Sequence, residues 1–316
     1  MEFWLEQGKI YERLKQVRHV MLEAIPEAGR LPAIAHTQVK NEGKMLRPAL
    51  LLLTAGLRTR PREAELLGAA LEYFHIASLV HDDIVDQAKL RRGEPAVAEQ
   101  HGISLALYTG DYLIWLAVKC LAKVDPGMVP DKLMDFMSPL LEAEAEQLET
   151  RFSTDISEEG YLRRIQAKTG LLFGYGAGAG FSLRSRDQRA LQKMKQAGLD
   201  LGVAFQLRDD LQDLADPEHP DLKEGNYTYP VLMAMQEDRT IRTLLEEARP
   251  SETRPAGDPS LYQEVVQRTL AAGGAACTEE AITAHADSAA RAFITTLGSE
   301  EWQIYQWMTG KLYGGR

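Results

Sequence analysis

The run HDDIVDQAKLRRG at 81–93 crowds together three aspartates, Asp82, Asp83 and Asp86. On a helix, Asp82 and Asp86 lie one turn apart on the same face, with Asp83 offset by one position. Two carboxylates on one face repel each other unless a cation bridges them. Oxygen ligands in this arrangement suit Mg²⁺, which keeps several waters and also takes substrate phosphates as ligands. For a single run of this kind, a solvated helix end is an equally ordinary interpretation.

A second run, DDLQD at 209–213, repeats the pattern with Asp209, Asp210 and Asp213. Both runs end a stretch of helix-periodic apolar residues, and in both the first and last aspartates share a face. Two such runs are hard to ascribe to solubility alone. We therefore expect two carboxylate walls that face each other across a cavity, with Mg²⁺ ions and a diphosphate between them.

Basic residues that could bind a diphosphate occur near the same segments. Arg91 and Arg92 follow the first run, Lys44 and Arg47 lie in GKMLRP, and Lys168 lies in KTG. Arginine and lysine are the usual partners of phosphate groups, arginine through its bidentate fork. Each of them alone is more often a surface charge, so their value depends on the aspartates beside them.

The composition is that of an ordinary globular protein, with 316 residues, 45% hydrophobic and 26% charged. A net charge of -10 disfavours nucleic acid as a partner, because phosphate backbones need a basic surface. Cys120 and Cys277 form neither a metal-binding spacing nor a disulfide framework, which favours a cytoplasmic location. The first residues do not resemble a signal peptide, and no apolar run looks long enough to span a membrane.

The elements that must position these residues are helices. Apolar residues recur at helical spacing, for example from Leu66 to Ala77, proline-rich breakers separate such stretches, and alternating strand-like runs are nearly absent. The sequence thus predicts an all-α fold. Residues 250–259 are the best candidate for a linker, but we expect one continuous helical domain over 1–316.

From about residue 40 to about 235, the chain resembles the trans-polyprenyl diphosphate synthases. The motifs GKMLRP, EYFHIASLVHDDIVDQAKLRRGEPAV, YTGDYL, KTG and FQLRDDLQD follow one another in the order of that family. The resemblance implies an isoprenoid synthase fold, with helices around a central cavity, and usually a homodimer. It also implies head-to-tail condensation of an allylic diphosphate, such as farnesyl or geranylgeranyl diphosphate, with isopentenyl diphosphate.

The resemblance assigns a role to each matching residue. His75 has an alternative role in the core, but it lies two turns before Asp82 on the same face, which favours a ligand role. By that resemblance, Mg²⁺ on the allylic diphosphate would be held by Asp82, Asp86 and Asp209, with support from Asp83, Asp210 and Asp213. The same diphosphate would be clamped by Arg91 and Lys168. Isopentenyl diphosphate would be bound by Lys44, Arg47, His75 and Arg92, and the forming carbocation would lie near Thr169 and Gln206.

This chemistry needs no nucleophilic triad. Metal ions and cationic side chains stabilise the negative charge that develops as diphosphate leaves carbon. An apolar helical cavity would keep the remaining allylic cation away from water. The double bond of isopentenyl diphosphate then attacks, and a proton is lost.

The loop after the second run departs from the family pattern. It is shortened to LADPEHPDLKEGNYTYP at 214–230, and Asn226 replaces a lysine of the family motif. Lys223 is the one lysine left there to close over the diphosphate. The shortened loop therefore makes a specialised or weakly active member of the family more plausible.

Two residues before the first run predict the length of the product. Ala77 and Phe74 lie three apart on one helix face that points away from the metals. In the family, an aromatic residue at the first of these positions stops growth at farnesyl. Since Ala77 is small, we expect a product longer than farnesyl, with Phe74 about one turn, roughly 5 Å, deeper.

Three rival functions share some of these features. A terpene cyclase would have a mixed second metal motif and no use for an isopentenyl diphosphate site. A peptide-modifying prenyltransferase shares the short loop and is the closer rival. A regulatory subunit would lack one or both aspartate runs, whereas a catalytic subunit of a heteromeric synthase stays open.

Overall fold

The computed structural model describes residues 1–41, 43–59, 61–124, 129–250 and 258–313, and it is built of helices. Within these ranges, extended structure is limited to β1 (Leu90–Arg91) and β2 (Glu94–Pro95), which pair antiparallel. The predicted all-α fold is confirmed.

The chain divides into two compact units. Unit 1 holds Met1–Met134, Tyr175–Lys195 and Phe293–Lys311, and unit 2 holds Asp135–Gly174, Gln196–Ala292 and Leu312–Arg316. The expectation of one domain over 1–316 stays a prediction. Five helices have residues in both units: α7 (Val129–Glu149), α9 (Leu171–Ser182), α10 (Gln188–Leu214), α15 (Gly274–Phe293) and α16 (Ser299–Tyr313).

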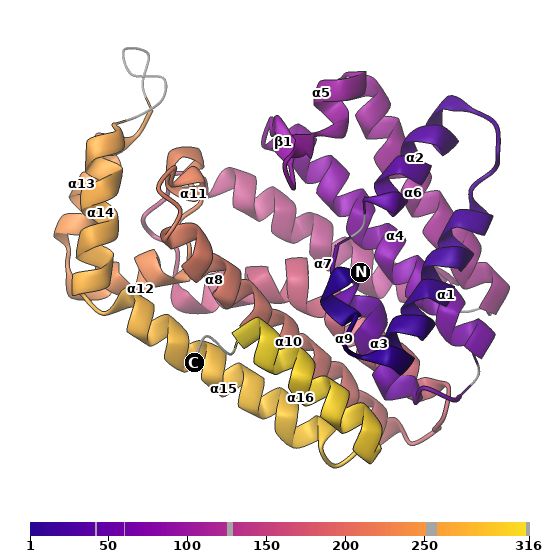
Figure 1. The fold of residues 1–316 in the computed structure, drawn as a ribbon. Coiled ribbons are helices and arrows are strands. Elements are labelled where there is room, and N and C mark those ends of the chain that lie inside the picture. Colours follow the sequence, from indigo (N-terminus) through magenta and orange to yellow (C-terminus); the bar gives the residue numbers. More distant parts are fainter. Residues whose placement is uncertain (42, 60, 125–128, 251–257, 314–316) are drawn as a thin grey trace. The chain divides into compact units, whose positions relative to one another are not determined.

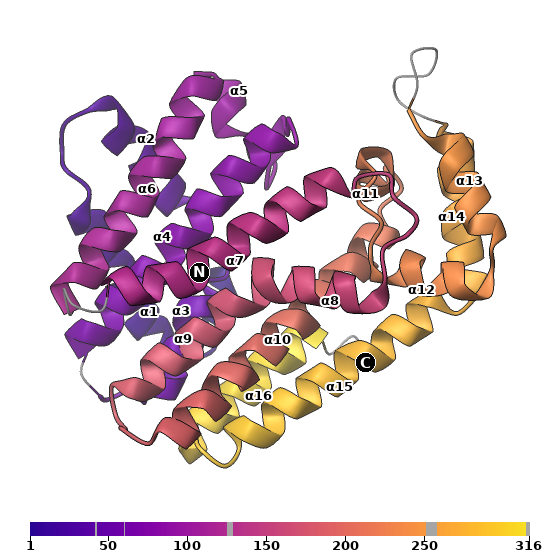
Figure 2. The same ribbon diagram turned by 180° about the vertical axis from the view of Figure 1, so that it is seen from behind.

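Unit 1 is organised around the long helix α4, which packs against α1, α3 and α6 (Figure 1; Figure 2 gives the view from behind). Its apolar residues form a core in which Tyr73 donates a hydrogen bond from its hydroxyl to the carbonyl of Met21. The elements wholly within unit 1 are a 3-10 turn (Glu2–Trp4), α1 (Gly8–Ala24), α2 (Arg30–Lys40), α3 (Leu46–Ala55), α4 (Pro61–Val85), β1, β2, α5 (Val97–His101) and α6 (Ile103–Val124).

The hairpin after α4 has a two-residue turn, Arg92-Gly93. Both residues have positive φ, 55° and 81°, as the tight turn that matches strand twist requires. Glycine adopts this conformation at little cost, and Arg92 is held there by its side chain, described below. The turn folds Arg91 back toward the end of α4.

Helix α6 corrects one expectation from the sequence. Ile103–Val124 is long and apolar enough to cross a membrane by length and composition, although we expected no run of that kind. It packs against α4, and 39% of its most apolar window is buried. One such helix is weak evidence for a membrane span, because the core helix of a folded domain passes the same test.

Unit 2 has its own apolar core, in which Val203 and Leu207 of α10 meet Val231 and Leu232. The helix over Thr240–Ala248 buries one face, made of Ile241, Leu244, Leu245 and Ala248, as its helical apolar spacing requires, whereas Tyr229–Met235 is buried on all sides. The elements wholly within unit 2 are α8 (Glu158–Ile165), a π-helical turn (Gln166–Gly170), α11 (Pro220–Glu224), α12 (Tyr229–Glu237), α13 (Thr240–Ala248) and α14 (Pro259–Ala271).

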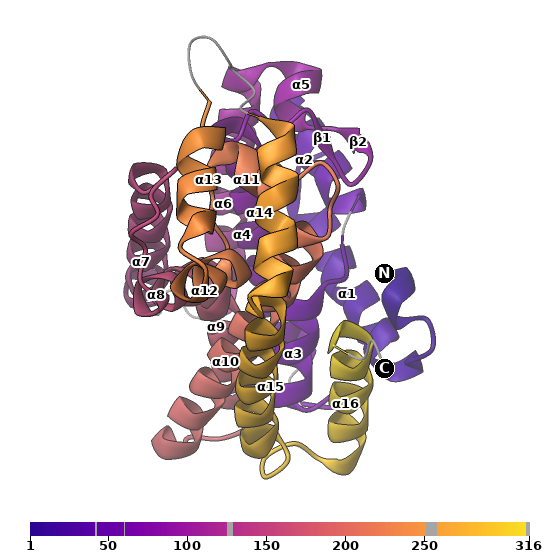
Figure 3. The same cartoon turned by 90° about the vertical axis from the view of Figure 1, so that its left-hand side faces the viewer.

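The segment after the expected linker packs on the segment before it. Helices α13 and α14 lie side by side, as Figure 3 shows, and the hydroxyl of Tyr262 donates to the carbonyl of Ala248 at 3.0 Å. Residues 251–257 of the expected linker lie outside the described residues. Both sides of the expected linker belong to unit 2.

Candidate active site

The first aspartate motif lies where α4 ends. Helix α4 stops at Val85, but the amide of Asp86 still donates to the carbonyl of Asp82 at 2.8 Å. The turn therefore stays helical through Asp86, and both carboxylates share one partly exposed face. This is the arrangement that the sequence predicted.

The middle aspartate of this motif points elsewhere. Asp83 is only 3% exposed, and its Oδ1 accepts from Arg91 Nε at 2.8 Å and from a second nitrogen of the same guanidinium. Arg91 arrives from the hairpin and keeps 41% of its side chain exposed. The structure thus joins the predicted clamp, Arg91, to the predicted supporting residue, Asp83.

Arg92 is anchored on the segment before α3. Its guanidinium donates to the carbonyl of Asn41 at 3.1 Å and lies over Gly43. A Cβ at Gly43 would come within 2.8 Å of Arg92 Cζ, so a larger residue here would displace the guanidinium from its present position. The glycine of GKMLRP therefore leaves room for Arg92.

The remaining predicted ligands of isopentenyl diphosphate also lie in unit 1. The carbonyl of Lys44 accepts from Trp4 Nε1, and its ammonium lies 5.9 Å from the centre of the Phe3 ring. Burial, and then the charges of Arg47, Arg92 and Arg91, hold the pKa of His75 well below its usual value. His75 is therefore a neutral hydrogen-bonding group among arginines.

The two positions assigned to product length are buried on α4. Phe74 is 7% exposed and Ala77 is 1% exposed. Their side chains belong to the interior of unit 1, as a role in lining an apolar cavity requires. That they line a tunnel stays a prediction.

The second aspartate motif ends α10. Asp209 and Asp213 are partly exposed, one turn apart on the helix, whereas Asp210 is 1% exposed. Burial, together with the nearby charge of Asp216, raises the pKa of Asp213. The outer carboxylates again share a face, as predicted, and the middle one points into the protein.

The carboxylate of Asp210 accepts two side-chain hydrogen bonds. Tyr161 Oη donates to Oδ2 at 2.6 Å, and Gln206 Nε2 donates to Oδ1 at 3.2 Å. Burial raises the pKa of Asp210 to about 6, although these hydrogen bonds act to lower it. The hydrogen bonds therefore only partly offset the cost of removing the carboxylate from water.

A π-helical turn carries the KTG motif. Thr169 Oγ1 donates to Gln206 Oε1 at 2.8 Å, and Lys168 Nζ lies 2.8 Å from both Gln147 Oε1 and Glu144 Oε2. Such turns are frequent at functional sites. Thr169 and Gln206, which the resemblance placed together near the carbocation, are in direct contact.

The lysine of the shortened loop forms an ion pair within that loop. Lys223, on α11, pairs with Glu218 at 3.1 Å, within the same loop. The backbone carbonyl of Gly225 accepts from the amide of Phe152 at 2.9 Å, which fixes the end of α11. The predicted closing role of Lys223 stays a prediction.

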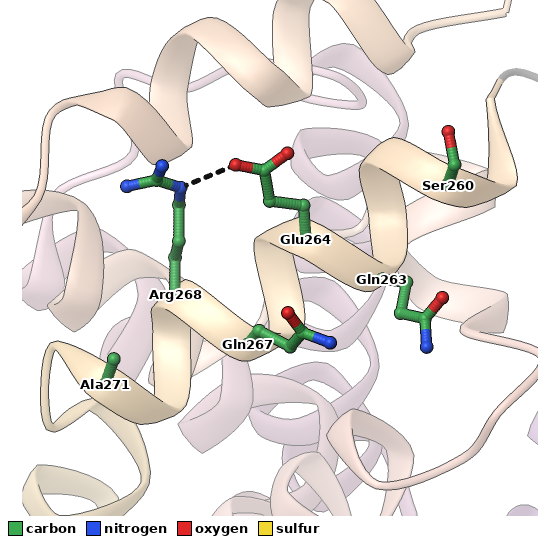
Figure 4. Close-up of a pocket in the computed structure, with 6 residues that line it drawn as sticks. All are labelled: Ser260, Gln263, Glu264, Gln267, Arg268 and Ala271. Carbon is green, nitrogen blue, oxygen red and sulfur yellow. Dashed lines mark hydrogen bonds and ion pairs between the residues drawn. The ribbon is translucent and has the colours of Figure 1, made fainter.

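A polar hollow lies on α14, away from both aspartate motifs in sequence (Figure 4). Arg268 donates to Glu264 at 2.9 Å and to Asp238 at 3.1 Å, and the three side chains are only partly buried. Partly exposed pairs of this kind contribute little and mark no chemistry. The residues that line the hollow all come from this one helix: Ser260, Gln263, Glu264, Gln267, Arg268 and Ala271.

Comparison with known proteins identifies the family. The polyprenyl synthetase family matches residues 29–264. The chain belongs to this family. It is a polyprenyl diphosphate synthase, and hence a prenyltransferase enzyme.

Two curated relatives and one solved structure illustrate the relationship. Heptaprenyl diphosphate synthase component 2 of Geobacillus stearothermophilus is 33% identical over 67% of this chain and 69% of its own. Nonaprenyl diphosphate synthase of Mycobacterium tuberculosis is 28% identical over 78% and 75%. A polyprenyl synthase structure from Caulobacter crescentus, complexed with calcium and isoprenyl diphosphate, is 26% identical, with a TM-score of 0.87 over 97% of this chain and 95% of that one.

The residues present fit a divalent metal of the kind that this family uses. Among the described residues, no three His, Cys, Asp or Glu side chains gather into a metal-binding group. Each aspartate motif instead offers two accessible carboxylates on one helix face. Such a pair suits Mg²⁺, because Mg²⁺ completes its shell with waters and substrate phosphates.

Tyr161 and Arg164 were not among the predicted site residues. The ring of Tyr161 lies 6.1 Å from the ring of Tyr229, centre to centre, and 5.1 Å from the guanidinium of Arg164. Arg164 is itself buried and donates to Thr150 Oγ1 at 3.1 Å. A tyrosine at a core position of the short helix before KTG was the available signal, because a buried phenol needs a partner.

Proposed function

We propose that this enzyme condenses an allylic diphosphate with isopentenyl diphosphate, head to tail, and releases diphosphate. The observation that carries the proposal is the geometry of its two DDxxD motifs. Each places an accessible carboxylate pair on the last turn of an apolar helix, and each has cationic side chains within its own unit. The product is a trans-polyprenyl diphosphate longer than farnesyl diphosphate.

Asp82, Asp86 and Asp209 are the residues that would hold Mg²⁺. When bound, the metal neutralises the diphosphate of the allylic substrate and so makes it a better leaving group. Asp213 supports Asp209 from the same face of α10. The prediction that the two carboxylate walls face each other stays part of this proposal.

The cationic side chains divide between the two substrates. Arg91 and Lys168 bind the allylic diphosphate. In the structure, Arg91 pairs with Asp83 and Lys168 pairs with Glu144, and these carboxylates hold the two side chains in an extended position in which they can bind the diphosphate. Charge-assisted hydrogen bonds to phosphate are stronger than neutral ones, so the substrate competes well for these donors.

The isopentenyl diphosphate site lies in unit 1. Lys44, Arg47 and Arg92 supply its positive charge, and a neutral His75 donates one further hydrogen bond without adding repulsion among the arginines. Thr169 and Gln206 stabilise the carbocation, and apolar walls exclude water.

Product length follows from α4. Ala77 leaves room for the growing chain, and Phe74, one turn further back, forms the floor or turns aside. Farnesyl or geranylgeranyl diphosphate is the expected primer. The names of the heptaprenyl and nonaprenyl synthases among the relatives support a product beyond farnesyl.

A homodimer is the proposed assembly. Helix α6 exposes Ile103, Leu107, Tyr108 and Trp115, although its other face is buried in unit 1. An exposed apolar stripe of this kind suits a second copy of the chain. The Geobacillus relative is one component of a heptaprenyl synthase, so a catalytic subunit with a separate partner is the alternative. A cytoplasmic location completes the proposal.

The test is a product assay. Purified protein is incubated with Mg²⁺, labelled isopentenyl diphosphate and, separately, dimethylallyl, geranyl, farnesyl or geranylgeranyl diphosphate. Elongation beyond the fifteen-carbon farnesyl chain is expected. Farnesyl diphosphate as the only product would contradict the proposed length. No elongation of any primer by folded protein would overturn the proposed activity of this chain by itself and would favour the heteromeric alternative.

A further inference from the structure

Four side chains of unit 2 form one hydrogen-bonded chain. Tyr161 donates to Asp210 at 2.6 Å, Gln206 donates to the other oxygen of Asp210 at 3.2 Å, and Thr169 donates to Gln206 at 2.8 Å. The chain leads from the core of unit 2 to the residues assigned to the carbocation. Tyr161 stands at its buried end.

The polarity of this chain is set by Asp210. An ionised carboxylate only accepts hydrogen bonds, so the amide group of Gln206 must turn its NH₂ toward Asp210. The carbonyl oxygen of Gln206 then faces Thr169, and the hydroxyl of Thr169 donates its one hydrogen to that oxygen. Gln206 Oε1 and Thr169 Oγ1 therefore present only lone pairs to any further group.

Lone pairs are what a developing cation requires. Oriented dipoles whose negative ends point at positive charge stabilise it without reorganising, provided that they are fixed beforehand. If the amide of Gln206 were reversed, its NH₂ would face the hydroxyl of Thr169 and present hydrogens instead. The orientation of one amide therefore decides the sign of the local field.

We propose that Tyr161 is a positioning residue for carbocation formation: through Asp210, it fixes the amide of Gln206 so that Gln206 and Thr169 present oxygen lone pairs. This inference rests on the proposed prenyl transfer. Tyr161 is well placed for the task, because it is only 4% exposed and is in contact with the ring of Tyr229 and the guanidinium of Arg164.

The structure supplies a matched pair of variants. Tyr161→Phe removes only the hydroxyl that donates to Asp210. Tyr229→Phe removes a neighbouring hydroxyl that donates to Glu158 Oε1 at 2.7 Å, outside the four-residue chain. Both keep the packed rings, so they differ mainly in which hydrogen bond is lost.

The measurement is kcat and KM for both substrates, with thermal unfolding of each variant. Loss of a hydrogen bond to a charged group predicts that Tyr161→Phe lowers kcat about ten- to hundredfold. A change of less than about twofold in KM is expected, since substrate binding is untouched. Tyr229→Phe should keep the kcat of the unmodified protein.

A second arm tests the route through Gln206 and Thr169. In a Thr169→Val background, Tyr161→Phe should lower kcat by a smaller factor than it does in the unmodified protein, because one of the two oxygens that it helps to orient has already been removed. Fully multiplicative effects would overturn the route. Equal kcat values for Tyr161→Phe and Tyr229→Phe would overturn the role of Tyr161, whatever their stabilities.

The two proposals can fail separately. An unmodified protein that elongates a primer, with a Tyr161→Phe variant of unchanged kcat, would overturn only the positioning role. An unmodified protein that elongates no primer would overturn the proposed function and the role of Tyr161 with it.

Discussion

The two aspartate motifs share a spacing but differ in what holds the middle carboxylate. In the first, Asp83 is paired with a cation, Arg91, which a tight hairpin brings back to the helix end. In the second, Asp210 accepts hydrogen bonds from two neutral donors, Tyr161 and Gln206. Under the proposed function, the first pairing would position a charged group for a diphosphate, and the second would position dipoles for a cation.

The comparison shows that DDxxD is not one functional unit. Its outer aspartates are accessible in both motifs and suit a metal, whereas the middle aspartate belongs to the protein interior. A buried carboxylate needs partners, and the partners available differ between a hairpin and a neighbouring helix. The same five-residue pattern can therefore serve both substrate binding and catalysis.

The largest effect is expected where the motifs are alike. Asp82→Ala and Asp209→Ala should each lower kcat/KM by about a thousandfold or more, because metal-ion stabilisation of the leaving group is worth several kcal/mol. Incorporation of labelled isopentenyl diphosphate measures this. Asp155→Ala, which removes an aspartate that is 83% exposed, is the control and should keep full activity. Normal activity of either motif variant would remove the metal assignment.

A smaller effect should separate the motifs. Asp83→Asn frees Arg91 from its charged partner and should raise KM for the allylic diphosphate about tenfold. Asp210→Asn lets the amide of Gln206 reverse and should lower kcat about ten- to hundredfold at nearly constant KM. Steady-state kinetics with each substrate varied in turn distinguishes the two. The same change in the same parameter for both variants would break the comparison.

The helix before the first motif should control product length. Phe74→Ala is expected to lengthen the main product by at least one isoprene unit, because the side chain assigned to the floor of the cavity is removed. Chromatography of the extracted products measures this. Leu79→Ala, a change at a partly exposed position of the same helix, should leave the product length unchanged.

The helix before the second motif carries a different kind of aspartate. Asp200 of α10 accepts hydrogen bonds from Ser288 at 2.7 Å and Gln196 at 3.0 Å, and it lies 3.6 Å from His285. Burial alone would raise the pKa of Asp200, but hydrogen bonds from these three groups lower it below its usual value. This network ties α15 to α10 and touches no predicted site residue.

The smallest effect is therefore on stability. Because the pKa of Asp200 is lower in the folded state than in the unfolded state, its ionisation stabilises the fold at pH values above the unfolded-state pKa. This stabilisation is lost as the pH falls through the folded-state pKa. Ser288→Ala should cost about 1 kcal/mol of unfolding free energy at pH 7, with kcat unchanged. The difference should begin to shrink as the pH falls below about 4, the ordinary pKa of the unfolded state, and should be lost once Asp200 is protonated in the folded state as well. Denaturant unfolding at several pH values measures it, and a difference that grows on acidification would contradict the assignment.

Much of the fold could be predicted from the sequence because helical periodicity and proline breakers are local signals. The face shared by Asp82 and Asp86, and the one shared by Asp209 and Asp213, follow from spacing alone. Helix α6 was misjudged, because its few charged residues do not interrupt an apolar window of membrane length.

The partners of the middle aspartates could not be predicted. The Asp83–Arg91 pair depends on a hairpin with two positive φ values, and the bond from Tyr161 to Asp210 joins residues 49 apart in sequence. The π-helical turn at Lys168 and Thr169 likewise has no signature in residue type. Such features depend on tertiary packing, which no local pattern encodes.

The most direct test of the central claim is the stoichiometry of the reaction. Diphosphate released and isopentenyl units incorporated are measured together, with farnesyl diphosphate as primer and Mg²⁺ either present or removed by a chelator. Our account predicts one diphosphate for each unit incorporated, and neither without Mg²⁺. Release of diphosphate without incorporation would show ionisation without condensation, as in a cyclase, and would contradict the account.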